Sequence, residues 1–181
     1  MYELKNYLLS MQSHWMINQH TYNAVQETVP MIAKYKSALG QEDLGKTPVH
    51  DIAKKIYPEI YRVPLFRRQF CKLLVKEIEQ MKKEIKFELY RNMWFVVQTV
   101  LNPMFNALWQ RDCKDPTSIQ IANYNLKDKK QGAWHHDESA DISVVVPLNT
   151  GSYEGGGTAF HNYGQINPLP TGHALMFPSF T

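Results

Sequence analysis

The chain has 181 residues, 44% of them hydrophobic and 20% charged, which is ordinary for a globular domain and enough to bury a core. No apolar run reaches the roughly 18 residues that span a bilayer, and the N-terminus lacks the basic start and cleavage site of a signal peptide. The two cysteines, Cys71 and Cys113, match no disulfide-rich or zinc-knuckle spacing. We therefore expect a cytoplasmic protein with no membrane partner.

The net charge of +3 is unevenly distributed along the chain. Residues 131–181 contain four acidic residues and no Lys or Arg, a formal charge of −4. Residues 1–130 carry all 20 basic residues and the other 13 acidic ones, a formal charge of +7. Two interpretations stay open: a basic, helix-rich surface beside a neutral strand region, or a basic face that meets an acidic partner.

The front half is predicted to be mainly helical. Apolar residues recur at steps of three and four over residues 1–39, with an interruption at Pro30 and a polar loop over residues 40–45. Tyr57–Leu65 is predicted to be extended, because each proline disfavours helix in the residue before it. An amphipathic helix is expected over residues 66–85. A second is expected over Phe95–Gln110, where Asn102-Pro103 marks a break or a new start.

After Pro116 the pattern becomes that of short strands. Ser118–Tyr124 alternates as a half-buried strand does, and further strands are predicted over residues 142–148, 158–163 and 173–177. Short strands joined by glycine-rich turns favour an antiparallel sandwich or barrel over a parallel sheet. The expected fold class is therefore α+β, with the helices first and a β core after them.

The segment Trp134-His-His-Asp137 stands directly before the strongest predicted strand. Residues i and i+2 of an extended backbone point to the same side, so His135 and Asp137 can offer a nitrogen and an oxygen to one point. Such a pair is two-thirds of the two-histidine, one-carboxylate triad that holds Fe(II) and leaves positions open for cosubstrate and O₂. His136 is expected to face away.

In this context the sequence resembles the 2-oxoglutarate- and Fe(II)-dependent dioxygenases, most closely their lysyl/prolyl hydroxylase branch. The matching stretches, in chain order, are Ile121–Tyr124, Trp134–Asp137, Ser143–Asn149, Tyr153–Phe160 and Gly172–Pro178. The resemblance covers residues 57–181 and implies a double-stranded β-helix, or jelly roll, with helices packed outside. Residues 1–56 are expected to be a mainly helical N-terminal extension.

The resemblance also implies site residues. His135 and Asp137 match the first two iron ligands, Tyr124 matches a position that lies against the cosubstrate, and Asn149 is a further candidate for that pocket. The glycines of residues 155–157 match a turn in which they serve backbone geometry. In the family, a third ligand histidine and an arginine that pairs with 2-oxoglutarate follow the strand matched by residues 172–178. Neither has a counterpart before Thr181, so we expect a C-terminally incomplete, inactive domain.

Three functions stay open at this stage. The first is an enzyme that uses Fe(II), 2-oxoglutarate and O₂, with ascorbate as a possible further cofactor, to hydroxylate a lysyl or prolyl side chain of a protein or peptide. The second is a nucleic-acid-modifying dioxygenase of the same superfamily, for which the basic front half would contact phosphates. The third is a non-catalytic jelly-roll module with a structural or interaction role.

Overall fold

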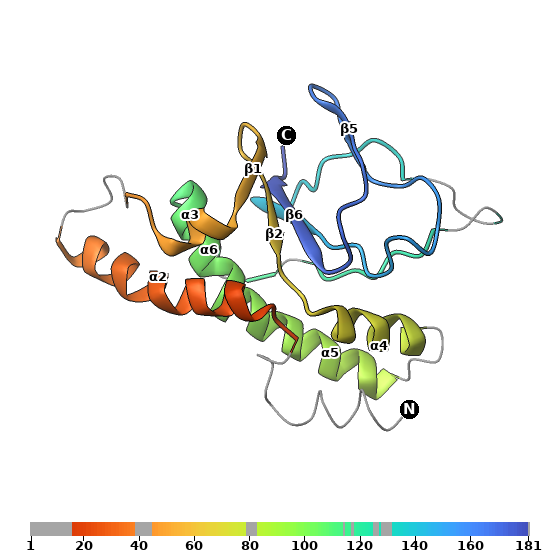
Figure 1. Ribbon diagram of the computed structural model, residues 1–181, viewed down its shortest axis with the longest axis horizontal. Helices are drawn as coiled ribbons and strands as arrows, with labels where there is room; N and C mark the ends of the chain where they lie inside the picture. Colours follow the sequence, from red (N-terminus) through yellow and green to blue (C-terminus); the bar gives the residue numbers. More distant parts are fainter. Residues whose placement is uncertain are drawn as a thin grey trace.

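The computed structural model describes residues 16–38, 45–78, 83–113, 115–116, 118–124, 127 and 132–180. The described elements, in chain order, are α2 (Gln19–Ala38), α3 (Pro48–Ile52), β1 (Lys54–Tyr57), β2 (Ile60–Pro64), α4 (Arg68–Ile78), α5 (Lys83–Val96), the π-helical segment η2 (Val97–Leu101), α6 (Asn102–Trp109), β3 (Ile142–Val145), β4 (Thr158–Phe160), β5 (Gly164–Ile166) and β6 (His173–Pro178). The predicted α+β class is confirmed, and Figure 1 shows the helices to the left of the strands and below them.

The main sheet has four strands in the order β1-β2-β6-β3, and every neighbouring pair is antiparallel. Strand β6 lies in the middle, where Met176 pairs with Tyr61 on one side and with Val144 on the other. Strands β4 and β5 form a separate antiparallel hairpin. The predicted antiparallel arrangement is therefore confirmed, although the described strands do not form a closed barrel.

The register gives the sheet two distinct faces, since directly paired residues point to the same side. Val63, Ala174 and Met176 point to the side covered by helices, which we call the helix face. Ile60, Leu175 and Phe177 point to the other side, the open face, where they pack against a second cluster. That cluster is completed by residues of the β4–β5 hairpin and the loop after it: Phe160, Ile166 and Leu169.

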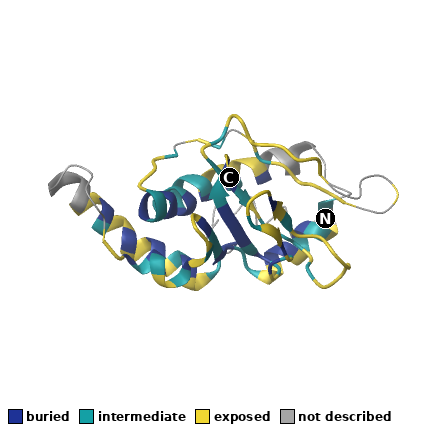
Figure 2. Cartoon of the chain, turned by 90° about the horizontal axis from the view of Figure 1, so that it is seen from above, coloured by how far each residue is buried: buried dark blue, intermediate teal, exposed yellow. Residues whose placement is uncertain are grey.

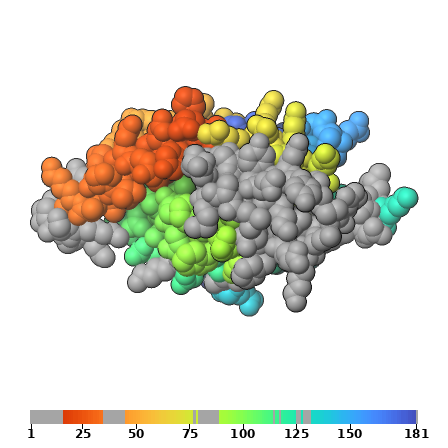
Figure 3. Space-filling view, turned by 90° about the horizontal axis from the view of Figure 1, so that it is seen from below, coloured from red at the N-terminus to blue at the C-terminus, as the bar shows by residue number. Residues whose placement is uncertain are grey.

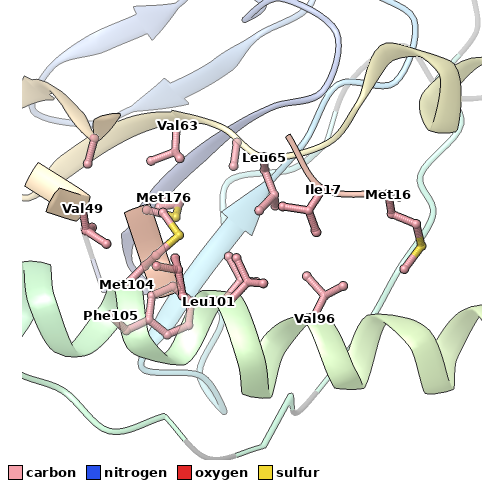
Figure 4. Packing of buried hydrophobic residues seen from close by; sticks show 14 of the residues in the cluster. Met16, Ile17, Val49, Val63, Leu65, Val96, Leu101, Met104, Phe105 and Met176 are labelled. Atoms are coloured by element: carbon pink, nitrogen blue, oxygen red, sulfur yellow. The ribbon is translucent and has the colours of Figure 1, made fainter. Parts of the chain in front are cut away.

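The larger core lies between the helix face and the helices. In Figure 4, Val96, Leu101, Met104 and Phe105 of the α5–α6 helical stretch approach the sheet. Each such side chain contributes about 1.5–3 kcal/mol when it is fully buried. Figure 2 shows the buried residues concentrated in the central strands and on the helix surfaces that face them. Helix α2 packs along α6, and the two lie side by side in Figure 3.

The helix changes its winding at Asn102-Pro103, where a break or a new start was expected, but its backbone stays helical throughout. A π-helical segment ends at Leu101, and α6 begins at Asn102, with Pro103 in its first turn. Proline removes one backbone N–H from the helix, and the looser π turn before it accommodates the change. The helix also extends further toward the N-terminus than the pattern indicated, because α5 begins at Lys83.

Two expectations about helices and strands are wrong. Helix α2 continues through Pro30 without an interruption; Val25 and Ile32 are both buried, and this packing offsets the loss of one backbone hydrogen bond. Residues 118–124 form no strand, and all of them except Ile119 are exposed. An alternating pattern produces a strand only where another strand edge is available to pair with it.

Other predicted helices and strands are present in the structure, but they begin or end at other residues than predicted. The extended stretch from Tyr57 is a hairpin, β1 and β2, joined at Pro58-Glu59. The first amphipathic helix is confirmed as α4, while residues 79–82 lie outside the described residues, as do residues 1–15 and most of the polar loop. Strand β5 was not predicted. No helix in the described ranges is both long and apolar enough to cross a membrane.

Candidate metal centre

His135 and Asp137 lie in an irregular segment that leads into β3, with their side chains directed toward each other. His135 Nε2 and Asp137 Oδ1 are 3.6 Å apart, and the side chains are 68% and 49% exposed. The ring of His136 lies instead near Phe180, with 6.3 Å between the ring centroids. The convergence of residues i and i+2, and the different direction of His136, agree with the sequence pattern.

The imidazole of His135 is oriented by the backbone. Its Nδ1 lies 2.7 Å from the carbonyl oxygen of Ala133. A carbonyl can only accept a hydrogen bond, so Nδ1 must carry the proton. In the neutral form of the ring the lone pair is then on Nε2, the atom that faces Asp137, and this is how metal-binding histidines are usually held.

The carboxylate of Asp137 is anchored through its other oxygen. Ser143 Oγ, on β3, donates a hydrogen bond to Asp137 Oδ2, and Ser179 Oγ, directly after β6, lies 2.9 Å from Ser143 Oγ. Because Ser143 has one hydroxyl proton, Ser179 donates to Ser143. The two serines are only 7% and 4% exposed. This chain of hydrogen bonds leaves Asp137 Oδ1 free to face His135.

Ser143 and Ser179 were not predicted as site residues from the sequence. Ser143 carries a weak signal, since it is the one polar residue in the run Ile142-Ser-Val-Val-Val146 and a polar residue there must find a partner. Ser179 carries no such signal in the sequence. Its role depends on the pairing of β6 with β3, which is a property of the fold.

The spacing of the two donor atoms is close to that of two ligands of one metal ion. Metal–ligand bonds of about 2.0–2.2 Å place neighbouring donor atoms about 2.8–3.1 Å apart at a right angle and about 3.3–3.6 Å apart at the tetrahedral angle. The observed 3.6 Å between His135 Nε2 and Asp137 Oδ1 needs only a small closure. An imidazole nitrogen with a carboxylate oxygen suits Fe(II), Zn²⁺ and similar ions.

Further metal ligands do not gather around this pair within the part of the chain that the structure describes, where no group of three or more His, Cys, Asp or Glu residues could hold a metal. His161 lies in the turn of the β4–β5 hairpin, with Nδ1 3.4 Å from Asn162 Oδ1. His173 begins β6, at the opposite end of that strand from Ser179.

The two predicted cosubstrate residues occupy different surroundings. Tyr124 is 52% exposed, and its hydroxyl lies near Gly132, 3.5 Å from the place that a Cβ atom would take there. It therefore lies close to the start of the segment that carries His135. Asn149 is exposed and closes a turn, since its carbonyl accepts hydrogen bonds from the Ser152 N–H and Oγ. Their roles toward a cosubstrate stay predictions.

The glycine-rich turn before β4 has the backbone role that was expected of it. Gly155, Gly156 and Gly157 all have positive φ angles, of 75°, 82° and 105°. At Gly157 a Cβ atom would lie 2.2 Å from the carbonyl oxygen of Ile166. Only glycine fits such a conformation and such a close approach.

Comparison with known proteins adds nothing to this geometry. No protein-family model matches the chain, and no curated protein is significantly similar to it.

Proposed function

We propose that this protein is a 2-oxoglutarate- and Fe(II)-dependent dioxygenase that hydroxylates a lysyl or prolyl side chain of a protein. The observation that carries the proposal is the arrangement of His135 Nε2 and Asp137 Oδ1, which lie 3.6 Å apart. Each side chain is oriented by a hydrogen bond that its other polar atom makes. The order of the family-like stretches around this pair supports the assignment to the dioxygenases.

In this proposal His135 and Asp137 hold Fe(II), and a third ligand comes from outside the described residues. Fe(II) held there would supply, with 2-oxoglutarate and O₂, the oxidation of a C–H bond: one oxygen atom would enter the substrate as a hydroxyl group and the other would enter succinate, with release of CO₂. Tyr124 and Asn149 help to seat the cosubstrate. The protein's own contribution is to position these groups and to limit access of water.

The jelly-roll fold is part of the same proposal. The helix face of the main sheet is covered by α2, α3 and the α5–α6 stretch, and the open face is partly covered by the β4–β5 hairpin. A jelly roll has this layering, with helices outside one sheet and a second sheet over its inner face. Ser143, which anchors Asp137, points to the open face because it pairs with Phe177.

A cytoplasmic location of the protein is part of the same proposal. Cys71 and Cys113 are both free thiols, as is usual in a reducing compartment. Burial raises the pKa of the Cys71 thiol to about 11, so it is a packing residue and not a nucleophile.

The test is turnover by the protein in its natural form. It is incubated with Fe(II), ascorbate, 2-oxoglutarate and lysine- or proline-rich peptides, with a methylated oligonucleotide as the alternative substrate. We expect succinate release coupled to the gain of one oxygen atom by a peptide, measured by mass spectrometry. His135→Ala should abolish this, and His136→Ala is the matched control because its ring lies against Phe180.

Each outcome decides between functions. Oxidation of the oligonucleotide instead of a peptide would favour a nucleic-acid-modifying enzyme. Absence of metal binding and of succinate release in the natural protein would contradict the proposal and leave a non-catalytic module.

A further inference from the structure

A cluster of cationic side chains lies on the open face of the main sheet, away from the His135–Asp137 pair. Lys54 on β1 pairs directly with Arg62 on β2, and Arg62 pairs with Leu175 on β6. His173 lies two residues before Leu175 on β6, so its side chain points to the same face as that of Arg62. Three neighbouring strands therefore place Lys54, Arg62 and His173 on one face of the sheet, with Arg62 on the strand between the other two.

The charges of this cluster are not compensated in the part of the chain that the structure describes. Lys54 and Arg62 are directly opposite each other, an arrangement in which like charges destabilise a sheet. Neither makes an ion pair with a described residue, and nor does Arg68, which begins α4 nearby. As a whole residue Arg62 is partly buried, and burial makes the absence of a counter-charge more costly.

His173 adds an unsatisfied polar atom to the same place. Its Nδ1 is buried and has no hydrogen-bond partner. The pKa of His173 is lowered, first by burial and then by Arg62, Arg68 and Lys54. A neutral imidazole can present Nδ1–H as a donor. The N-terminus of α4 is close as well, because the Phe66 N–H donates to the carbonyl of Gly172, the residue before His173.

We propose that Lys54, Arg62 and His173 form a binding site for a small dianionic oxyanion, with Arg68 adding to its positive potential. Two cationic donors and one imidazole N–H match the oxygens of a phosphate group or of a dicarboxylate. The ligand removes the repulsion between Lys54 and Arg62 and gives His173 Nδ1 a partner.

This site is separate from the candidate metal centre. Ser143 pairs with Phe177 while Arg62 pairs with Leu175. The two residues are thus two strands apart and two residues offset, about 12 Å between their Cα atoms. His173 lies farther from Ser143, since it is four residues before Phe177 on β6, and the test is therefore made without a metal.

The test is thermal unfolding with EDTA present, in phosphate, in succinate and in chloride at equal ionic strength. In phosphate at ten times its dissociation constant, the Tm of the wild type should rise by about 3–6 °C. Arg62→Gln should lose this rise. Lys55→Gln is the matched control, because Lys55 is the next residue of β1 and its Nζ lies over the Tyr61 ring, 6.0 Å from the centroid; it should keep the rise.

Two further results separate binding from a structural role. In chloride, Arg62→Gln should unfold at the same or a higher temperature than the wild type, since no partner of Arg62 is lost. In NMR spectra, the imidazole resonances of His173 should shift with phosphate in the wild type and not in Arg62→Gln. An equal effect of succinate would support the site and identify carboxylates as ligands. The same Tm response in all three proteins, or a destabilised Arg62→Gln in chloride, would overturn the proposal.

Discussion

At the scale of single residues, the candidate metal centre depends on two groups that do not touch the metal position. Ala133 orients His135 through its carbonyl, and Ser143 orients Asp137 through its hydroxyl. Groups that hold metal ligands in place typically change metal affinity by about 10–100-fold when they are removed. Ser143 is therefore a positioning residue in our account.

Ser143→Ala should weaken Co(II) binding, with Co(II) as a spectroscopic probe for Fe(II), by about tenfold or more. The physical reason is that Asp137 loses the donor to Oδ2 and can rotate away from His135. Ser143→Thr keeps the hydroxyl and should restore most of the affinity. Ser152→Ala removes a turn hydroxyl that bonds to Asn149 and is the control. Equal affinity in Ser143→Ala and the wild type would show that Asp137 is not held by this serine.

His173 gives a prediction about pH. Its folded-state pKa is lowered by burial and by Arg62, Arg68 and Lys54, so it lies below the unfolded value of about 6.5. As pH falls below 6.5, the unfolded chain takes up a proton that the folded chain resists. Stability should therefore decrease as the pH falls through the folded pKa.

The measurement is Tm against pH from about 7.5 to 5, in chloride and without phosphate. His173→Gln should make the curve flatter over this range, whatever its effect on Tm at pH 7.5. A slope unchanged by the substitution would contradict the prediction. With phosphate present the wild-type curve should also become flatter, because a bound anion favours protonated His173.

At the scale of elements, the sequence predicted best the helices and strands that depend least on which other segment packs or pairs with them. Strand β6 is found close to its expected bounds. Helix α4 confirms the first part of the helix expected over residues 66–85, whereas residues 83–85 belong to α5. Strand β3 was also expected, although it ends at Val145 and not at Leu148. The stretch over residues 118–124 has an equally good alternating pattern and forms no strand, because no edge pairs with it.

Gly172 connects several elements at the start of β6. Its carbonyl accepts hydrogen bonds from the Leu65 and Phe66 N–H groups, and its N–H donates to the carbonyl of Pro147. Its φ angle is +82°, and a Cβ atom there would lie 2.4 Å from the carbonyl oxygen of Phe66. The chain can make this junction only with glycine.

Gly172→Ala should therefore lower the free energy of unfolding by about 2–4 kcal/mol, through backbone strain and the clash with Phe66. Gly164→Ala is a matched control, since Gly164 has a φ angle of +73° and nothing within 4 Å of its Cβ position. It should cost only about 1–2 kcal/mol. Urea denaturation of both variants measures the difference, and equal losses would show that the steric contact is unimportant.

At the scale of the whole molecule, the sequence predicted the α+β class and the antiparallel strands, while the way in which distant segments meet could not be read from it. Residues 131–181 contain no Lys or Arg, and one of the two interpretations of this pattern was a neutral strand region. The fold contradicts this, because β2 from the front half pairs with β6 and brings Arg62 into the main sheet. Similarly, α2 and α3 supply Val25 and Val49 to the core that covers the helix face.

The central claim is that His135 and Asp137 hold a metal ion, and the most direct test is an anaerobic calorimetric titration of Fe(II) into the natural protein containing this chain. We predict binding that weakens at least about tenfold in His135→Ala and in Asp137→Ala. His136→Ala, whose altered side chain lies near Phe180, should bind within about twofold of the wild type, with all variants folded by circular dichroism. Equal affinity in all four proteins, or a loss in His136→Ala as large as in His135→Ala, would contradict the account.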